Sequence, residues 1–189
     1  ESHLNEWNYV RGWSDEWVYS LECESGRFSQ KGAASIAAVM ITCQDAPLDL
    51  LMFYDARVGC GMNNMFDTLT LKPMKGYYPF LAWRRLADLG TQVKASVATP
   101  DVKRPQLFAC AAKNAAGKLA LFVARYSDDN NIVETRRVKI PVPPGLSFEN
   151  VRCHVTDAVR TYTETPLVVG SDGSATLKLE PNSFALVEW

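Results

Sequence analysis

The spacing of the apolar residues changes near Gly90, and this change restricts the folds open to the chain. Before Gly90, apolar runs alternate with segments of helical period, whereas from Gln92 onward apolar and polar residues alternate. The first pattern is typical of parallel strands joined by helices, and the second of antiparallel strands with one covered face. The sequence therefore predicts an α/β segment over residues 1–90 and an all-β segment over residues 91–189.

The elements expected before Gly90 alternate between strand and helix. A short strand covers Ser2–Tyr9, and an alanine-rich helix over Arg27–Cys43 has apolar residues around almost its whole circumference. Leu48–Tyr54 is a near-continuous apolar run, which is typical of a strand buried on both faces of a parallel sheet. A helix over Tyr77–Leu89 completes the segment. In such βαβα arrangements, active sites lie at the C-terminal edge of the strands.

The second segment is predicted to be an antiparallel β-sandwich. About seven or eight short strands at regular spacing, separated by turn clusters such as Pro143-Pro144-Gly145, are typical of that fold. The clearest strands are Lys118–Arg125, Arg137–Ile140, Val151–Val155, Ala175–Glu180 and Phe184–Trp189. The acidic turn Asp128-Asp129 is interpreted as a solvated hairpin turn, because the ligand spacing of a calcium loop is absent.

Composition argues against several classes of partner. Hydrophobic residues make up 47% and charged residues 22% of the 189-residue chain, and the formal net charge is −1. This charge balance gives no reason to expect nucleic acid or an anionic membrane as a partner. The longest apolar stretch, Ala33–Ile41, is about half the length that a membrane-spanning helix needs.

The five cysteines and two histidines form no metal-binding motif. No Cys-x-x-Cys pair or Cys/His ligand spacing occurs, which argues against a zinc site. No feature of the sequence implies a cofactor or another metal. Cys43, Cys110 and Cys153 lie in apolar patterns, where free thiols act as small buried hydrophobes. Cys23 and Cys60 lie in predicted loops and are candidates for a disulfide if the protein is exported.

The segment Leu4–Asn8 carries the residues best suited to chemistry. Glu6 offers a carboxylate, Trp7 a flat apolar ring and Asn8 an amide, all near the end of the first predicted strand. A carboxylate can attack or stabilise an oxocarbenium-like centre, an indole can pack on a pyranose ring, and an amide can bind hydroxyl groups. These residue types predict a sugar-cleaving site, with an idle solvated glutamate as the alternative.

Other polar and aromatic residues have structural alternatives as well. Tyr54 and Asp55 end the second predicted strand and are candidates to line the same subsite, with a structural hydrogen bond as the alternative. Trp7 is either a sugar platform or a packing residue, and Asn8 either binds hydroxyls or orients a loop. The first predicted loop is interpreted as packed tryptophans and a solvated acidic face: Trp13, Trp17, Asp15, Glu16, Glu22 and Glu24.

In this order, the elements resemble the C-terminal portion of clan-A glycoside hydrolases, in particular the β-xylosidase/α-L-iduronidase family. The resemblance rests on Glu6-Trp7-Asn8, Arg27–Cys43, Leu48–Asp55, Tyr77-Tyr78-Pro79-Phe80 and Pro181–Val187. In that family these segments are the end of the seventh strand of a (β/α)8 TIM barrel, the following helix, the eighth strand, the last helix and the closing strand of a β-sandwich. The resemblance covers nearly the whole chain, but only the glutamate motif carries chemistry.

The resemblance implies that Glu6 is the nucleophile of a retaining hydrolase, which needs a second carboxyl about 5–5.5 Å away. The family's acid/base glutamate follows an asparagine at the end of the fourth strand. Asn5-Glu6 is not that pair, because only one strand–helix unit follows it before the last helix and the sandwich. We therefore expect the last part of a barrel with its sandwich, inactive alone. The expected partners are a carbohydrate substrate and either the preceding barrel portion or a second copy.

The alternative is a non-catalytic carbohydrate-binding or scaffolding module formed by the sandwich, with residues 1–90 as a remnant. Against it, the predicted strands carry few aromatic residues that would be exposed, and Tyr162 and Trp189 are the main candidates. A hydrolase that degrades polysaccharides is expected to be secreted or periplasmic.

Overall fold

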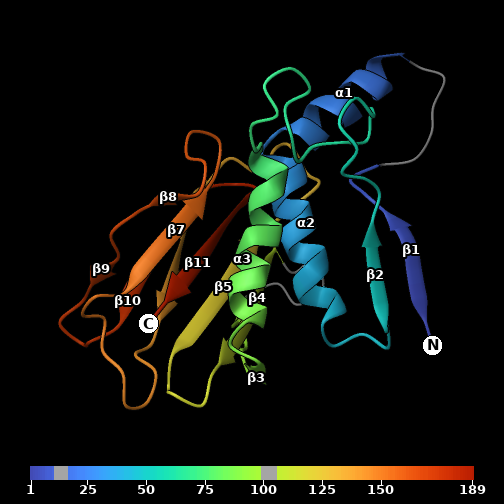
Figure 1. Ribbon diagram of the computed structural model, residues 1–189. Coiled ribbons are helices and arrows are strands. Elements are labelled where there is room, and N and C mark those ends of the chain that lie inside the picture. Colours follow the sequence, from blue (N-terminus) through green and yellow to red (C-terminus); the bar gives the residue numbers. More distant parts are fainter. Residues whose placement is uncertain (11–16, 99–105) are drawn as a thin grey trace.

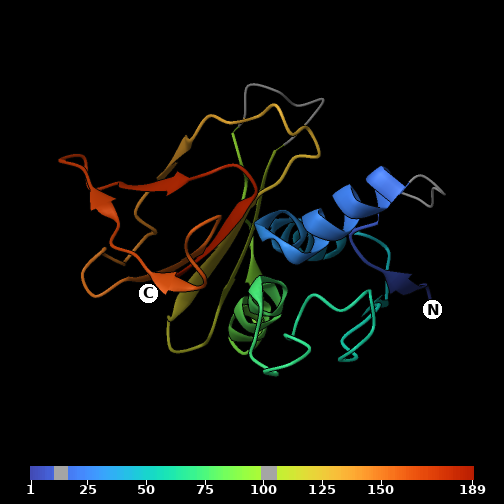
Figure 2. The same ribbon diagram turned by 90° about the horizontal axis from the view of Figure 1, so that it is seen from above.

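The computed structural model describes residues 1–10, 17–98 and 106–189. Its elements lie in layers, with a parallel pair of strands on one side, helices in the middle and antiparallel sheets on the other side (Figure 1). The view from above shows the same order, with the helices between the parallel pair and the antiparallel sheets (Figure 2). The first segment contains β1 (His3–Trp7), α1 (Trp17–Phe28), α2 (Gln30–Cys43), β2 (Leu50–Phe53), the 3-10 turn η1 (Lys75–Tyr77) and α3 (Tyr78–Ala87).

The parallel pairing of β1 with β2 confirms the βαβ unit expected from the sequence. His3 pairs with Leu50 and Trp7 with Phe53, and the register shifts between these two pairs. The predicted last helix is also present as α3, with a proline in its first turn. Eight such strands would close a barrel. The described residues contain this one parallel pair.

The predicted single helix over Arg27–Cys43 is wrong at its start, because two helices meet at Ser29. Ser29 has extended backbone angles, and its hydroxyl accepts a hydrogen bond from Lys31 N (3.1 Å), which caps α2. Helix α1 occupies much of the predicted loop, so Glu22 and Glu24 are exposed on a helix. Trp17 begins this helix, whereas Trp13, Asp15 and Glu16 lie outside the described residues.

The helices pack on one face of the larger sheet through small side chains. Ala33, Ala37, Ala38 and Ile41 of α2 join Ala82 and Leu86 of α3 in one buried cluster with sheet residues. The sheet contributes Cys110, Ala112, Ala120, Phe122, Ala124, Phe184 and Leu186. Alanines on a helix allow its backbone to approach a sheet closely at the density of a protein interior. Residues of both predicted segments therefore share one apolar core.

The second segment forms two antiparallel sheets, in agreement with the predicted sandwich-like arrangement. The strands are β3 (Thr91–Val93), β4 (Leu107–Lys113), β5 (Leu119–Arg125), β6 (Arg136–Ile140), β7 (Arg152–Thr156), β8 (Thr163–Glu164), β9 (Val168–Val169), β10 (Ala175–Leu179) and β11 (Ser183–Glu188). One sheet has the order β3-β4-β5-β11-β7-β8, and the other β6-β10-β9. Within β5, Phe122 belongs to the helix-facing cluster, whereas Val123 belongs to a second cluster shared with Ile140 and Leu179 of the smaller sheet. The period-two pattern thus buries both faces of the larger sheet.

The burial predicted for β2 is wrong on one face. Leu50 and Met52 are 45% and 43% exposed, whereas the alternate residues Leu51 and Phe53 are half-buried. The helices cover only one face of the parallel pair, and no layer of the described residues covers the other. Apolar side chains on an open face of this kind mark a surface that favours association.

The α1–α2 joint should not tolerate a side chain at Gly32. A Cβ atom there would overlap the carbonyl oxygen of Arg27, which is fixed backbone. We expect Gly32→Ala to lower the free energy of unfolding by about 1–3 kcal/mol, measured by urea denaturation. Gly61→Ala is the control, since a Cβ at Gly61 has nothing within 4 Å. Stabilisation by Gly32→Ala, as helix propensity alone would give, would contradict this packing.

Candidate active site

Glu6 and Tyr54 lie at the same edge of the parallel pair, where both strands end. The backbone of Tyr54 donates a hydrogen bond to Trp7 O (2.9 Å), which fastens the two strand ends together. Trp7 is in register with Phe53 on the helix-covered face. Glu6 and Tyr54 are exposed at this edge, each next to a half-buried aromatic residue, Trp7 and Phe53 respectively. The structure thus brings together the predicted nucleophile and one predicted substrate-binding residue.

The carboxylate of Glu6 is exposed. Within the described residues it makes no hydrogen bond or ion pair, and its exposure leaves its oxygens accessible to a substrate. Such a carboxylate can act as a nucleophile, but it needs a partner that supplies a proton to the leaving group.

Trp7 packs on neighbouring aromatic rings. Its ring lies edge-to-face on Phe53 with the centroids 5.1 Å apart, and Phe53 lies in the same way on Phe80 of α3 (5.3 Å). These contacts join the end of β1 to the last helix and correspond to the packing alternative for Trp7. The indole Nε1 is buried without a hydrogen-bond partner among the described residues.

Asn8 ties the end of β1 to the chain that follows β2. Its Nδ2 donates to the carbonyl oxygens of Tyr54 (2.5 Å) and Met62 (2.7 Å), and its Oδ1 accepts from Tyr9 N (2.6 Å). All three contacts are with backbone atoms, so Asn8 orients loops, as the second alternative for this residue predicts.

Asp55 is held by Arg57. Arg57 Nε donates to Asp55 Oδ2 (2.7 Å), Arg57 N donates to Asp55 Oδ1 (3.0 Å), and Arg57 Nη2 donates to Tyr54 Oη (3.1 Å). Burial acts to raise the pKa of the Asp55 carboxyl, but the hydrogen bonds from Arg57 outweigh it and hold that pKa below its usual range. Asp55 is therefore a carboxylate near neutral pH and is poorly suited to donate a proton.

Two residues that the sequence analysis did not select hold this edge in place. Arg27 is buried, its Nε donates to Tyr9 O (3.4 Å), and its Nη1 donates to Gly61 O. Tyr9 is also buried, and its hydroxyl donates to Asp128 Oδ1 (3.2 Å) in the loop after β5. The available signal was a charged residue in an otherwise apolar helical pattern, since a buried arginine requires acceptors.

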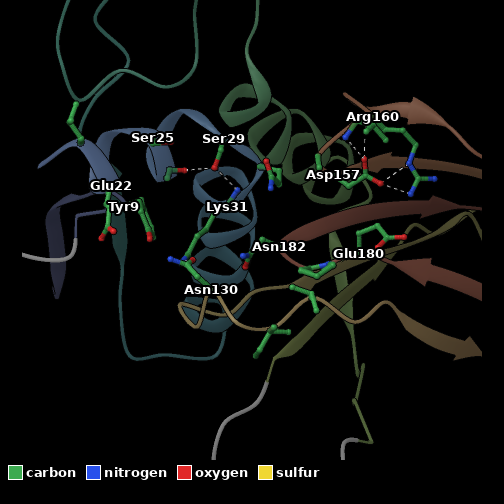
Figure 3. Close-up of a pocket in the computed structure, with 18 residues that line it drawn as sticks. Tyr9, Glu22, Ser25, Ser29, Lys31, Asn130, Asp157, Arg160, Glu180 and Asn182 are labelled. Carbon is green, nitrogen blue, oxygen red and sulfur yellow. Dashed lines mark hydrogen bonds and ion pairs between the residues drawn. The ribbon is translucent and has the colours of Figure 1, made fainter. Parts of the chain in front are cut away.

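A cleft of about 1070 Å³ lies beside this edge, between the α1–α2 joint and loops of the sandwich (Figure 3). Its walls include Tyr9, Glu22, Lys31, Asn130, Asp157 and Asn182. Glu6 and Tyr54 do not line it. Of the described residues near the strand ends, Tyr9 is the one that belongs to both the cleft wall and the segment after Glu6.

Cys23 and Cys60, the candidates for a disulfide, are not paired, and all five cysteines are free. Cys23 is buried, and its Sγ lies 3.8 Å from Tyr9 O. Cys60 Sγ lies 4.0 Å from Arg57 Nη2, so the two thiols have different neighbours. The described residues contain no group of three potential metal ligands. Among them, no helix has both the length and the apolar character required to cross a bilayer.

The aromatic residues considered for a sugar platform on the sandwich are packed against other rings. Tyr162 stacks between Tyr78 (centroids 5.3 Å apart) and His154 (4.6 Å), and Trp189 packs on Phe148 (5.6 Å). In the described part of residues 91–189, the exposed large hydrophobic side chains are all valines. An aromatic platform for a sugar ring is therefore absent from these described residues.

Removing the side chain of Arg57 should raise the pKa of Asp55. Arg57→Gln deletes the guanidinium but leaves the burial that disfavours the charged carboxylate. Carbon-13 NMR of the side-chain carboxyls, followed during a pH titration, would measure the shift. Arg84→Gln is the control, because Arg84 pairs with the exposed Asp88. An Asp55 titration that is the same in Arg57→Gln and in the wild type would contradict the assigned cause.

Comparison with solved structures shows a shared fold. The chain superposes over 98% of its length on 41% of a family 30, subfamily 8 glycoside hydrolase xylanase from Clostridium acetobutylicum (TM-score 0.66, 12% identity). A family 30 endoxylanase from Clostridium papyrosolvens C71 gives a TM-score of 0.65 at 14% identity, again with 98% of this chain and 41% of that one. A family 44 xyloglucanase from Paenibacillus polymyxa gives a TM-score of 0.62 at 12% identity. The match covers 98% of this chain and 31% of the xyloglucanase.

The chain thus spans about two fifths or less of these glycoside hydrolases. No protein-family profile matches the sequence, and no curated protein matches it. At such low identities the similarity is one of fold, and it does not single out the β-xylosidase/α-L-iduronidase family. The chain has the fold of a part of these glycoside hydrolases.

Proposed function

We propose that this chain forms part of a retaining glycoside hydrolase in which Glu6 is the nucleophile. One observation carries the proposal: Glu6 presents an exposed carboxylate at the C-terminal edge of a parallel strand pair. Active sites lie at that edge in parallel α/β enzymes. The shared fold with glycoside hydrolases supports the same reaction class.

In the proposed reaction, a Glu6 oxygen attacks the anomeric carbon as the bond to the leaving oxygen breaks. A second carboxyl group protonates that oxygen and later removes a proton from the water that releases the sugar. The two carboxyls of a retaining site are about 5–5.5 Å apart. Asp55 does not fit the acid role, because its ion pair with Arg57 keeps it ionised. We place the acid/base residue on barrel strands outside residues 1–189.

The remaining site residues would bind or position the sugar. Tyr54 is 36% exposed beside Glu6 and is the residue that we propose contacts the sugar directly. Trp7, Asn8 and Asp55 would contribute to substrate binding by fixing the strand ends through the contacts described above. Removing any of them should therefore affect the position of Glu6 and Tyr54 together.

The proposed substrate is a carbohydrate polymer or oligomer, with β-xylosides and β-glucosides as the first compounds to test. The similar structures include xylanases and a xyloglucanase, which motivates this choice. Because polysaccharides do not pass through a cell membrane, we propose a secreted or periplasmic location.

We further propose that β1 and β2 are strands of a (β/α)8 barrel, with a domain boundary near Gly90. Two strands cannot close a barrel, which has eight. The outer edges of β1 and β2 are unpaired within the described residues, and Leu50 and Met52 lie exposed on the open face. Further barrel strands, from a longer chain or from another polypeptide, would pair with these edges and cover this face.

A non-catalytic sugar-binding module is the second candidate. The packed positions of Tyr162 and Trp189 weigh against it, since sugar platforms need exposed aromatic faces. If the wild-type protein turns over a glycoside, and Glu6→Gln loses this turnover while it still binds polysaccharide, the enzyme is favoured. Binding with no turnover in any form of the protein would favour the module.

Glu6→Gln in the intact protein should lower kcat on an activated aryl glycoside by at least about a thousandfold, because an amide is a poor nucleophile. The fold should be unchanged, since the side chain is exposed. Glu24→Gln, an exposed glutamate of α1, is the matched control and should keep wild-type kcat. With the wild-type protein, NMR of the product that forms first should show that the anomeric configuration is retained. Wild-type kcat in Glu6→Gln would rule out Glu6 as the nucleophile.

Residues 1–189 alone should show no glycosidase activity and should self-associate through the open face of β1 and β2. We expect sedimentation velocity to show species larger than a monomer. Replacement of Leu50 and Met52 by lysine should reduce that association, because charged side chains disfavour contact between apolar faces. Lysine at the exposed Val142 of the sandwich is the control. A monodisperse wild-type monomer that hydrolyses a glycoside would contradict the barrel proposal.

A further inference from the structure

We propose that Asp128 of the sandwich is a positioning residue for Glu6, acting through Tyr9. The inference rests on the proposed function of Glu6 and assigns the β5–β6 loop a role in that same site. The sequence alone indicates only a solvated hairpin turn at Asp128-Asp129. The structure instead places Asp128 where the sandwich, α2 and the segment after β1 meet.

The carboxylate of Asp128 is bound by three side chains. Its Oδ1 accepts hydrogen bonds from the hydroxyls of Tyr9 (3.2 Å) and Tyr126 (2.7 Å). The ammonium of Lys31, at the start of α2, lies 3.6 Å from the same oxygen. Lys31 Nζ also donates to Asp128 O and to Asn130 Oδ1, both at 2.8 Å. The turn is therefore fastened to α2 as well as to Tyr9.

The donors Tyr9 and Lys31 are shielded from solvent, although the Asp128 side chain is about half exposed. Tyr9 and Lys31 are 6% and 7% exposed. Burial, reinforced by the Asp128 carboxylate, raises the pKa of the Tyr126 hydroxyl well above its usual range, so this phenol remains a hydrogen-bond donor. Hydrogen bonds to an ionised acceptor are stronger than those between neutral groups. The carboxylate is thus a defined attachment point and not a freely solvated charge.

Tyr9 transmits this attachment to Glu6 by a short route. The ring of Tyr9 fits against Gly26, where a Cβ atom would lie 2.7 Å from Tyr9 Cε1. The backbone of Tyr9 is bound on both sides, by Asn8 Oδ1 at its nitrogen and by Arg27 Nε at its oxygen. Glu6 is only three residues away on β1, beyond this fixed point. A displacement of Tyr9 would therefore move the end of the strand that carries the nucleophile.

The geometry also separates positioning from folding. The apolar cluster of α2, α3 and the larger sheet joins the helices to that sheet, and Asp128 is not a member of it. Loss of the Tyr9 hydroxyl should therefore leave the layers assembled while it loosens the segment after β1. Small displacements of a reacting group can cost up to about a hundredfold in rate.

The test compares Tyr9→Phe and Asp128→Asn with Glu6→Gln and a control variant in the intact protein. Thr135→Val is the matched control, because it removes another hydroxyl–carboxylate hydrogen bond of the same loop (Thr135 Oγ1 to Glu180 Oε2, 2.7 Å) without contacting Tyr9. For Tyr9→Phe and Asp128→Asn we expect kcat to fall about tenfold with KM changed less than twofold. The double variant should lose no more than either single variant, and Thr135→Val should keep wild-type kcat.

Hydrogen–deuterium exchange gives a readout that does not depend on activity. The peptide spanning residues 3–10 should exchange several times faster in Tyr9→Phe and Asp128→Asn than in Thr135→Val. Wild-type kcat and wild-type exchange in Tyr9→Phe would overturn the positioning role. If Glu6→Gln kept full turnover while Tyr9→Phe still loosened residues 3–10, the proposed nucleophile would fail, but the hold of Asp128 on this segment would stand.

Discussion

The close packing of the alanine-rich helix α2 on the six-stranded sheet is the contact on which the other parts of the structure depend. Ala37 and Ala38 bring the helix backbone near Phe122, and the gain in dispersion contacts grows as the gap closes. With α2 fixed, Lys31 in its first turn reaches the β5–β6 loop. The helix layer also covers one face of the parallel pair, where Phe53 of β2 packs on Phe80 of α3. The helices therefore lie between the sheet and the strand that bears Glu6.

Much of this architecture could be predicted from the spacing of apolar residues, because each buried face imposes its own period. Strand β5 is the clearest case, since its consecutive residues Phe122 and Val123 enter different cores. The break at Ser29 and the one-sided exposure of β2 could not be predicted in this way. The capped joint at Ser29 leaves the apolar pattern of the flanking helices intact, so the pattern does not reveal it. An apolar run such as that of β2 has the same sequence pattern whether one face or both faces of the strand are covered.

In the candidate site, too, some residues could be predicted from the sequence and others could not. Glu6 and Tyr54 could be selected because Glu6 lies near the end of one predicted strand and Tyr54 ends the next, and the ends of parallel strands meet at one edge. The hydrogen bond from Tyr9 to Asp128 joins residues separated by 119 positions, so no local pattern reports it. No local pattern reports the neighbours of Cys23 and Cys60 either. Cys23 lies against Tyr9 and Arg27, and Cys60 lies against Arg57.

The central claim is that Glu6 forms a covalent bond to the sugar, and trapping that intermediate tests it most directly. The intact protein would be incubated with 2-deoxy-2-fluoro glycosides of xylose and glucose that carry an activated leaving group, since such compounds form the glycosyl-enzyme faster than water releases it. Peptide mass spectrometry should then find one added fluoroglycosyl group on the peptide that contains Glu6. A label on a different carboxylate, or turnover of the parent glycosides with no trapped adduct, would contradict the account.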